Sequence, residues 1–269
     1  MSDLAIVYMV AGMSSRFGGK IKQFAKVGPN GETLIQYSLN QAIKAGFNKI
    51  VFIVGKLTEI PFKEMFGNSY NGIPISYAKQ DFNPEDRDKP WGTCDSLCSA
   101  SQVIDCPFVV CNGDDIYGEM NFRKLAAHLK NSEDEATLGF KLVDSIPDTG
   151  KANRAIFSVN NGYVQSLIET FSIEKSNFSL TNTHPEDHCS MNIYALHPKV
   201  IPELLISLEK FKKEHQGDRK AECLLPAEIT NIISQGKIQM RIYPAVDKWV
   251  GVTSPEDEEI TREILKNSI

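Results

Sequence analysis

The sequence lacks any hydrophobic run long enough to cross a membrane. Its N-terminal apolar segment, Leu4–Val10, is far too short for a bilayer and has no basic flank of the kind found in signal peptides. Acidic residues outnumber basic ones by 34 to 29, so the net charge of −5 provides no broad basic surface for a nucleic-acid backbone. We therefore expect a cytoplasmic protein that binds neither membranes nor nucleic acid, with any phosphate site confined to a local basic segment.

The six cysteines include no C-x-x-C pair, which argues against a redox motif or a standard zinc site. Several lie in apolar runs, and this placement predicts reduced, mostly buried thiols. The chain also has no internal repeat, low-complexity tract or linker. We expect residues 1–269 to form one domain, with a first half at 1–118 and a second half at 119–269.

Strand-like and helix-like segments alternate in the first half. Short apolar runs predict buried strands at 4–10, 50–54, 73–78 and 108–111. Helical periodicity predicts helices at 33–46, 93–104 and 119–130. This alternation predicts an α/β fold, a three-layer sandwich around a mostly parallel, Rossmann-like central sheet. Ligands of such sheets bind beyond the carboxyl ends of the strands, which directs attention to the segments that begin at Ala11, Gln80 and Asn112.

The second half has a different pattern. Asn160-Asn161-Gly162 lies between two strand-like segments and predicts a small β-hairpin over 154–168. The polar segment 171–189 lacks periodicity and is predicted to be a loop. Further expected elements are a strand at 190–196, helices at 199–215 and 222–235, a strand at 238–243, and a helix after Pro255.

The first expected strand leads directly into a basic, glycine- and serine-rich loop. No acidic residue occurs between Leu4 and Gly31, whereas four cations do: Arg16, Lys20, Lys22 and Lys26. Small residues allow backbone N–H groups to approach an anion closely, and an arginine can place two N–H groups on phosphate oxygens. The loop is therefore a candidate phosphate site.

Two familiar phosphate loops do not match this segment. A Walker loop needs a glycine where the chain has Ser14, and a serine or threonine where it has Ile21. The dinucleotide pattern G-x-G-x-x-G fails because Ser14 follows Gly12 at the second glycine position. A nicotinamide-dependent oxidoreductase is therefore disfavoured.

The loop resembles the signature of the sugar-nucleotide pyrophosphorylases, the family of the glucose-1-phosphate thymidylyl- and uridylyltransferases. The matching residues are Ala11, Gly12, Met13, Ser14, Ser15 and Arg16, followed by Lys22. The resemblance implies that the backbone of 11–15 and Arg16 hold a nucleoside triphosphate. It also implies that Lys22 stabilises charge on the α-phosphate.

Other segments extend this resemblance along the chain. Gln80, with the Gly92-Thr93 turn that opens a helix, is similar to the segment that reads the nucleobase. Asn112-Gly113-Asp114-Asp115 is similar to the family's Gly-Asp metal site. Alignment on the Gly-Asp step assigns Mg²⁺ to Asp114 and a structural role to Asp115, although an exchange of the two roles stays open.

The acceptor half matches the family at fewer positions. Glu169 ends a segment similar to the strand whose glutamate holds sugar hydroxyls, and Asn192 lies in a segment where the family's asparagine faces the acceptor. Asn112 is expected to contact substrate as well. The segment from Asp247 to Asp257 resembles the closing Trp…Thr-x-x-Asp motif.

The chain departs from the family at two positions. Thr170 replaces the usual lysine after the glutamate, which puts in doubt the charge contact to the acceptor's phosphate. Gly251 replaces a second metal-binding aspartate, so Asp247 or a water would have to supply that ligand.

The resemblance implies an enzyme that joins a nucleoside triphosphate to a sugar 1-phosphate and releases pyrophosphate, with Mg²⁺ as cofactor and Arg16, Lys22 and Asp114 as catalytic residues. Two alternatives remain open. One is a cytidylyltransferase for an alcohol phosphate such as phosphocholine. The other is a catalytically weak regulatory protein that binds nucleotide sugars. Assembly into a homo-oligomer stays open as well.

Overall fold

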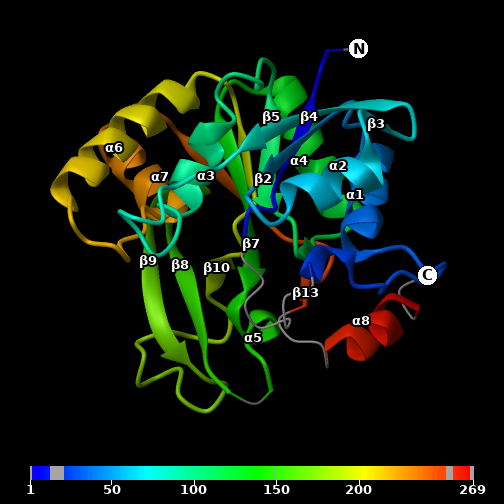
Figure 1. Ribbon diagram of the computed structural model, residues 1–269. Helices are drawn as coiled ribbons and strands as arrows, with labels where there is room; N and C mark the ends of the chain where they lie inside the picture. Colours follow the sequence, from blue (N-terminus) through cyan, green and yellow to red (C-terminus); the bar gives the residue numbers. More distant parts are fainter. Residues whose placement is uncertain (1, 13–20, 149, 253–256, 267–269) are drawn as a thin grey trace.

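The computed structural model describes residues 2–12, 21–148, 150–252 and 257–266 (Figure 1). In these residues an eleven-stranded sheet runs in the order β10-β8-β9-β12-β7-β11-β5-β1-β2-β4-β3. The expected α/β architecture, with helices on both sides of a large central sheet, is confirmed. The sheet is continuous across residue 118. The expectation that residues 1–269 form one domain stays a prediction.

Four parallel strands form the first half of the sheet. They lie in the order β5 (Phe108–Asn112), β1 (Ala5–Met9), β2 (Lys49–Val54) and β4 (Ile73–Lys79). The short strand β3 (Ser69–Tyr70) pairs antiparallel with β4 at the sheet edge. Every residue of β1 is buried, because helices cover both faces of this part of the sheet. This explains why the strand is a continuous apolar run rather than an alternating one.

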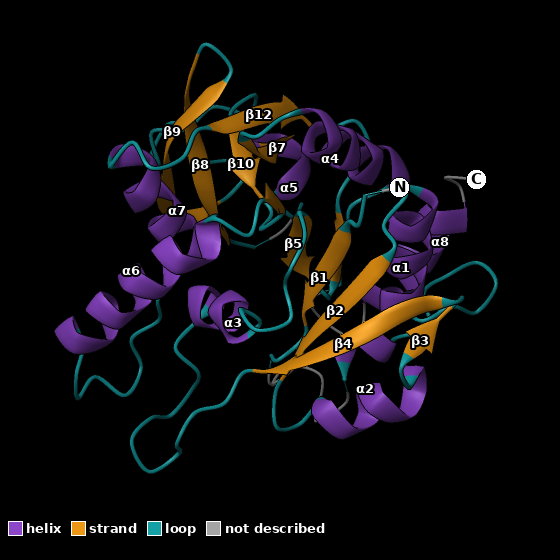
Figure 2. Cartoon of the chain, turned by 90° about the horizontal axis from the view of Figure 1, so that it is seen from above, coloured by secondary structure: helices purple, strands orange, loops and turns teal. Residues whose placement is uncertain are grey.

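Two helical layers sandwich these strands (Figure 2). One layer contains α1 (Leu34–Lys44), α2 (Glu59–Phe66) and α4 (Glu119–Asn131), which pack against Ile6 and Tyr8 of β1. The other contains α3 (Thr93–Ser99), α6 (Val200–Glu214) and α7 (Leu225–Ser234), which pack against Ala5, Val7 and Met9. The second half of the chain thus supplies most of one layer over the first half's strands.

The second half of the sheet is mixed in direction. The strand β11 (Tyr194–Leu196) joins the two halves by pairing antiparallel with β5 and with β7 (Glu135–Lys141). The strand β12 (Met240–Pro244) runs parallel to β7. The expected hairpin is confirmed as β8 (Ala152–Asn160) and β9 (Tyr163–Ile173), with Asn161 and Gly162 at positive φ in its turn. The strand β10 (His188–Ser190) pairs with both β8 and β7. The strands β10, β8, β9, β12 and β7 therefore form a closed ring of paired strands.

Some expected elements differ in the structure. Residues 190–196 do not form one strand, because Asn192 has φ +55° and separates β10 from β11. Part of the expected loop 171–189 is strand, since β9 continues to Ile173. The helix α2 was not expected, and its Pro61 lies in the first turn, where a missing backbone N–H leaves no helical hydrogen bond unmade.

Five further elements are short or terminal. They are the 3-10 turn η2 (Lys22–Phe24), the helix α5 (Leu142–Ser145), the two-stranded ribbon of β6 (Asp115–Ile116) and β13 (Val250–Gly251), and the helix α8 (Asp257–Lys266). No helix in the described ranges has both the length and the apolar character needed to cross a membrane. The six cysteines are free and buried, as their apolar surroundings predicted.

Asn121 is a buried polar residue that joins α4 to the segment before β13. Its amide nitrogen donates to the carbonyls of Tyr117 at 2.7 Å and Asp247 at 3.0 Å, and its Oδ1 accepts the backbone N–H of Val246 at 2.8 Å. A single side chain therefore satisfies three backbone groups from two distant segments.

We predict that Asn121→Ala lowers the free energy of unfolding by about 2–4 kcal/mol, because buried backbone groups lose their partners. Urea denaturation followed by circular dichroism measures this change. The matched control is Asn131→Ala in the same helix, where an exposed amide makes one bond of 2.7 Å to Ala127. The control should cost less than about 0.5 kcal/mol, and equal losses in the two variants would contradict the role of Asn121.

Candidate active site

The segments expected to bind a ligand meet at one edge of the sheet. Parallel pairing aligns Met9 with Asn112 and Val54 with Lys79, so the chain leaves β1, β5 and β4 at the same edge. Ala11, Gln80 and Asp114 follow these strands closely. Met13, Ser14, Ser15 and Arg16 lie outside the described residues, so the contacts expected of them stay predictions.

A mostly apolar cavity of about 830 Å³ opens beyond β1 and β4. Predicted residues Ala11 and Gln80 line it, together with Leu57, Phe82 and Pro90 among others. An apolar cavity with a polar group at its wall suits a nucleobase, whose faces are apolar and whose edge forms hydrogen bonds. The cavity is therefore the candidate base site.

The side chain of Gln80 is fixed in one orientation. Its Nε2 donates to the carbonyl of Gly92 at 3.0 Å and to Asp95 Oδ2 at 2.9 Å, and Lys212 Nζ lies 2.8 Å from Asp95 Oδ1. Both amide hydrogens are thus engaged, so the remaining capacity of Gln80 is that of an acceptor at Oε1. Gln80 was expected to read the nucleobase, and for that role the structure leaves it only an acceptor.

The wall of the base site is fastened to the second half of the chain. Gly92 has φ +98°, and a Cβ there would lie 2.6 Å from the carbonyl oxygen of Cys223, so only glycine fits. Thr93 Oγ1 accepts the backbone N–H of Leu225 at 2.9 Å. Arg87 donates to the carbonyls of Asp218 and Ala221. Gly92 and Thr93 do not line the cavity itself, and the Gly92 carbonyl connects this segment with it by accepting the bond from Gln80.

Lys22 and Asp114 form an ion pair at the carboxyl end of β5. Asp114 is half-buried, whereas the neighbouring Asp115 is buried. Burial, and next the charge of Asp114, raises the pKa of Asp115 above its ordinary value. Asp114 is thus the more exposed of the two carboxylates, and the metal role expected of it stays a prediction.

Asp115 is held by a buried hydrogen-bond network. Asn112 Nδ2 donates to Asp115 Oδ2 at 2.9 Å, and the Tyr117 hydroxyl lies 3.2 Å from the same oxygen. That hydroxyl donates to the carbonyl of Met191 at 2.7 Å, in the residue before Asn192. The structure therefore brings Asn112 and Asn192 into one neighbourhood with the two aspartates. The sequence did not single out Tyr117.

Two further residues surround this neighbourhood. Glu169 is half-buried on β9, and burial raises the pKa of its carboxyl while the charge of Arg154 lowers it. The guanidinium carbon of Arg154 lies 5.5 Å from the centre of the Trp249 ring. Arg154 was not among the predicted residues, because its place across the ladder from Thr170 depends on strand register.

Gly251 occupies a position at which a side chain has no room. The strand β13 pairs antiparallel with β6, and Gly251 is opposite Asp115. A Cβ on Gly251 would lie 2.2 Å from Trp249 Cζ2 and 3.0 Å from Asp115 Oδ1. Gly251 stands at the position of the family's second aspartate. Its lack of a side chain allows Trp249 and Asp115 to pack closely there.

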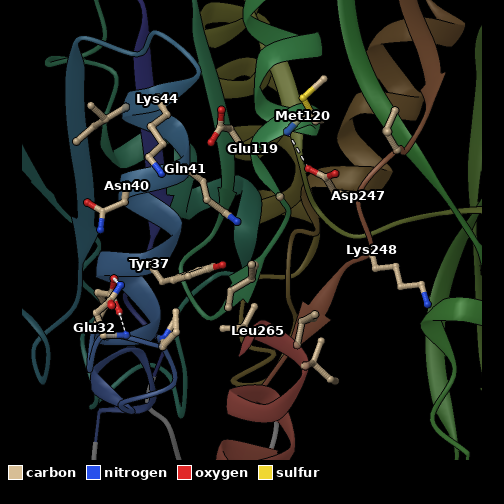
Figure 3. Close-up of a pocket in the computed structure, with 18 of the residues that line it drawn as sticks. Glu32, Tyr37, Asn40, Gln41, Lys44, Glu119, Met120, Asp247, Lys248 and Leu265 are labelled. Carbon is tan, nitrogen blue, oxygen red and sulfur yellow. Dashed lines mark hydrogen bonds between the residues drawn. The ribbon is translucent and has the colours of Figure 1, made fainter. Parts of the chain in front are cut away.

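Asp247 has a different environment from Asp114. Its Oδ2 accepts the backbone N–H of Met120 at 2.7 Å, in the first turn of α4 (Figure 3). A carboxylate there satisfies an unpaired N–H and complements the helix dipole. It lines a separate cavity of about 880 Å³ beside α1 and α8. The metal role expected of Asp247 stays a prediction, and its carboxylate already serves as a helix cap.

The donor set at the end of β5 suits magnesium. Mg²⁺ takes hard oxygen ligands and is commonly held by one or two carboxylates together with substrate phosphates. No cluster of three or more His, Cys, Asp or Glu side chains that could hold a metal occurs among the described residues. Asp114, with its half-buried carboxylate, fits the first pattern rather than an all-protein cage.

Comparison with known proteins identifies the family. The model of the nucleotidyl transferase family matches residues 19–259. The chain belongs to this family. The resemblance found in the sequence is thus confirmed, and the chain is an enzyme of the nucleotidyltransferase type. No protein of curated function matches this nucleotidyltransferase in sequence.

Solved structures share the fold of this nucleotidyltransferase at low identity. A protein from Bacillus anthracis assigned as a glucose-1-phosphate thymidylyltransferase has a TM-score of 0.69 at 15% identity, covering 98% of this chain and 96% of that one. A UDP-glucose pyrophosphorylase complexed with UDP-glucose gives 0.69 at 15%, with 100% of both chains covered. The inositol-1-phosphate CTP transferase from T. maritima gives 0.68 at 14%, covering 98% and 96%.

We predict that Gly251→Ala destabilises this nucleotidyltransferase by about 1–3 kcal/mol, since the added methyl group overpacks the Trp249 ring. Urea denaturation of a double-mutant cycle with Trp249→Leu tests the cause. The smaller side chain should recover about 1 kcal/mol or more of the loss. If Gly251→Ala cost the same with tryptophan and with leucine at position 249, the steric explanation would be wrong.

Proposed function

We propose that this nucleotidyltransferase couples a nucleoside triphosphate to a sugar 1-phosphate and forms a nucleotide sugar and pyrophosphate. The observation that carries the proposal is the Lys22–Asp114 pair at the end of β5. It lies at the same sheet edge as the Gln80 cavity, and the buried network of Asp115 links it to the segment of Asn192. This arrangement offers three neighbouring sites: one for the base, one for the phosphates and one for the acceptor.

The proposed reaction is a single in-line displacement. An oxygen of the acceptor's phosphate attacks the α-phosphorus and forms a new P–O bond. The bond from the α-phosphorus to the oxygen that bridges to the β-phosphate breaks, and pyrophosphate leaves with that electron pair. The backbone of 11–15 and Arg16 would hold the triphosphate, and Lys22 would stabilise charge on the α-phosphate. Such catalysis is positioning plus electrostatics and needs no covalent protein intermediate.

We assign the proposed Mg²⁺ ligand to Asp114. The bound ion would neutralise charge on the triphosphate. In the structure, Asp114 forms an ion pair with Lys22. Asp115 keeps the segment after β5 in place through Asn112 and Tyr117, so its role is to position Asp114.

On the acceptor side we assign Glu169 and Asn192 to the sugar. A carboxylate accepts two hydrogen bonds from adjacent hydroxyls, which phosphocholine does not offer. The alternative of an alcohol-phosphate cytidylyltransferase is consistent with the structural similarity to the inositol-1-phosphate CTP transferase. Inositol also carries adjacent hydroxyls, so the acceptor has to be found by experiment.

The decisive experiment is a matrix of four nucleoside triphosphates against glucose 1-phosphate, inositol 1-phosphate and phosphocholine, with detection of released pyrophosphate. Turnover with the sugar phosphate supports the proposal, whereas turnover only with inositol 1-phosphate or phosphocholine supports the alcohol-phosphate cytidylyltransferase. If no combination releases pyrophosphate while a nucleotide sugar still binds, the regulatory role replaces both.

We predict that Lys22→Ala lowers kcat by about two to four orders of magnitude, the range seen for lost electrostatic stabilisers. The KM for the nucleoside triphosphate should change less than kcat. The charge-matched control is Lys63→Ala, an exposed lysine of α2 that pairs with Glu59. Steady-state kinetics that show unchanged turnover in a folded Lys22 variant would remove this residue from the mechanism.

We predict that Asp114→Asn raises the Mg²⁺ concentration for half-maximal activity about tenfold or more, because a metal that bridges phosphates needs the full carboxylate charge. Asp115→Asn should have the milder effect. Calorimetric titration of Mg²⁺ into the nucleotide-bound protein provides a measurement independent of turnover. An affinity that fell only in the Asp115 variant would reverse the two assignments.

A further inference from the structure

Arg154 is a half-buried cation that forms no ion pair with a described carboxylate. Its side chain extends from β8, where Nη1 donates to the carbonyl of Asn153 at 2.9 Å and Nη2 donates to the carbonyl of Ser145. Its Nε is buried and has no hydrogen-bond partner in the described part of the chain. The guanidinium thus keeps unused N–H donors, and one of them, at Nε, is shielded from water.

An unpartnered buried donor needs an explanation. Leaving such a group without an acceptor costs free energy, more for a charged group than for a neutral one. Burial lowers the pKa of Arg154 and the nearby charges of Cys189, Asp115 and Glu169 raise it, while arginine stays protonated in proteins. A phosphate matches this group well, because the planar guanidinium can place two parallel N–H groups on two phosphate oxygens.

The surroundings of Arg154 place it inside the candidate active site. Its guanidinium carbon lies 5.5 Å from the Trp249 ring centre, and that ring packs against Gly251 beside Asp115. The indole Nε1 of Trp249 is buried too. Its proximity lowers the pKa of Asp115, but no acceptor meets it at hydrogen-bonding geometry. Two buried N–H donors therefore lie together near the aspartates.

Strand register connects Arg154 with the departure at Thr170. In the hairpin, Arg154 is the ladder partner of Thr170, and Ala155 is the partner of Glu169. A cation on β8 at this register position is one strand away from the position where a lysine would stand on β9. The positive charge absent at 170 is thus present on the neighbouring strand.

We propose that Arg154 binds the phosphate of the acceptor and thereby positions its attacking oxygen. This inference rests on the proposed function, since it assigns one group of the proposed acceptor to one residue. Lys22 then contacts the triphosphate, and Arg154 contacts the phosphate of the acceptor. Glu169 contacts the acceptor's hydroxyls and Arg154 its phosphate.

Steady-state kinetics with the acceptor found in the substrate matrix test this proposal. Arg154→Gln should raise the KM for that acceptor roughly 30- to 100-fold, as expected for a lost bidentate phosphate contact, and change the KM for the nucleoside triphosphate less than about threefold. Arg154→Lys should recover part of the loss. The matched control is Arg241→Gln, whose guanidinium lies 5.1 Å from the Tyr163 ring centre on β9. An unchanged acceptor KM, or equal effects on both substrates, would overturn the assignment.

A binding measurement that needs no turnover separates this inference from the proposed function. The chain has two tryptophans, so Trp91→Phe leaves Trp249 as the only one. Inorganic phosphate should change the Trp249 fluorescence saturably in this background, and adding Arg154→Gln should abolish the change in a protein that remains folded by circular dichroism. A wild type that releases no pyrophosphate with any acceptor refutes the proposed function alone, whereas phosphate binding that survives Arg154→Gln refutes the role of Arg154 alone.

Discussion

The parallel pairing of β1 with both β2 and β5 is the constraint on which the site depends. The two ladders keep Met9 level with Ile53 and with Asn112, so the loops that leave these strands emerge at one height. Helices bury β1 on both faces, and its backbone therefore has no alternative partner in water. If β1 slipped by one residue against its neighbours, its apolar side chains would move to the opposite faces of the sheet. Burial of both faces opposes such a slip.

A buried polar cluster then fixes the floor of the site. Asp115, Asn112 and Tyr117 satisfy one another and reach the carbonyl of Met191, which joins the end of β5 to the turn before β11. Such networks specify a single arrangement because a half-satisfied member is costly. The ribbon of β6 and β13 adds Trp249 to this floor. Trp249 packs so closely that position 251 has no room for a side chain.

The sequence allowed the first half of the fold to be predicted and the candidate site to be located, for physical reasons that particular residues show. The strands β1 and β5 are apolar runs because they are buried on two faces, and the cations near Lys22 stand out in an acidic chain. The strand β7 was missed because it begins with Glu135. That carboxylate is buried, and it forms hydrogen bonds with His197, which lies far along the chain.

Arg154 and the Asp95–Lys212 pair could not be found for a similar reason. Their roles depend on strand register and on contacts between distant segments, which no local pattern encodes. The phosphate loop shows the opposite case, since its expected role comes from the sequence and Met13 to Arg16 lie outside the described residues.

The attachment of the base-site wall to the second half has a consequence for how this enzyme can be recombined. Arg87, Gly92 and Thr93 belong to the first half, yet their partners at Asp218, Cys223 and Leu225 come from the second. A chimera that took residues 1–118 from a relative would place a foreign wall against these partners. If the proposed base site is correct, transfer of a nucleobase preference requires the segment 218–225 to move together with 80–95.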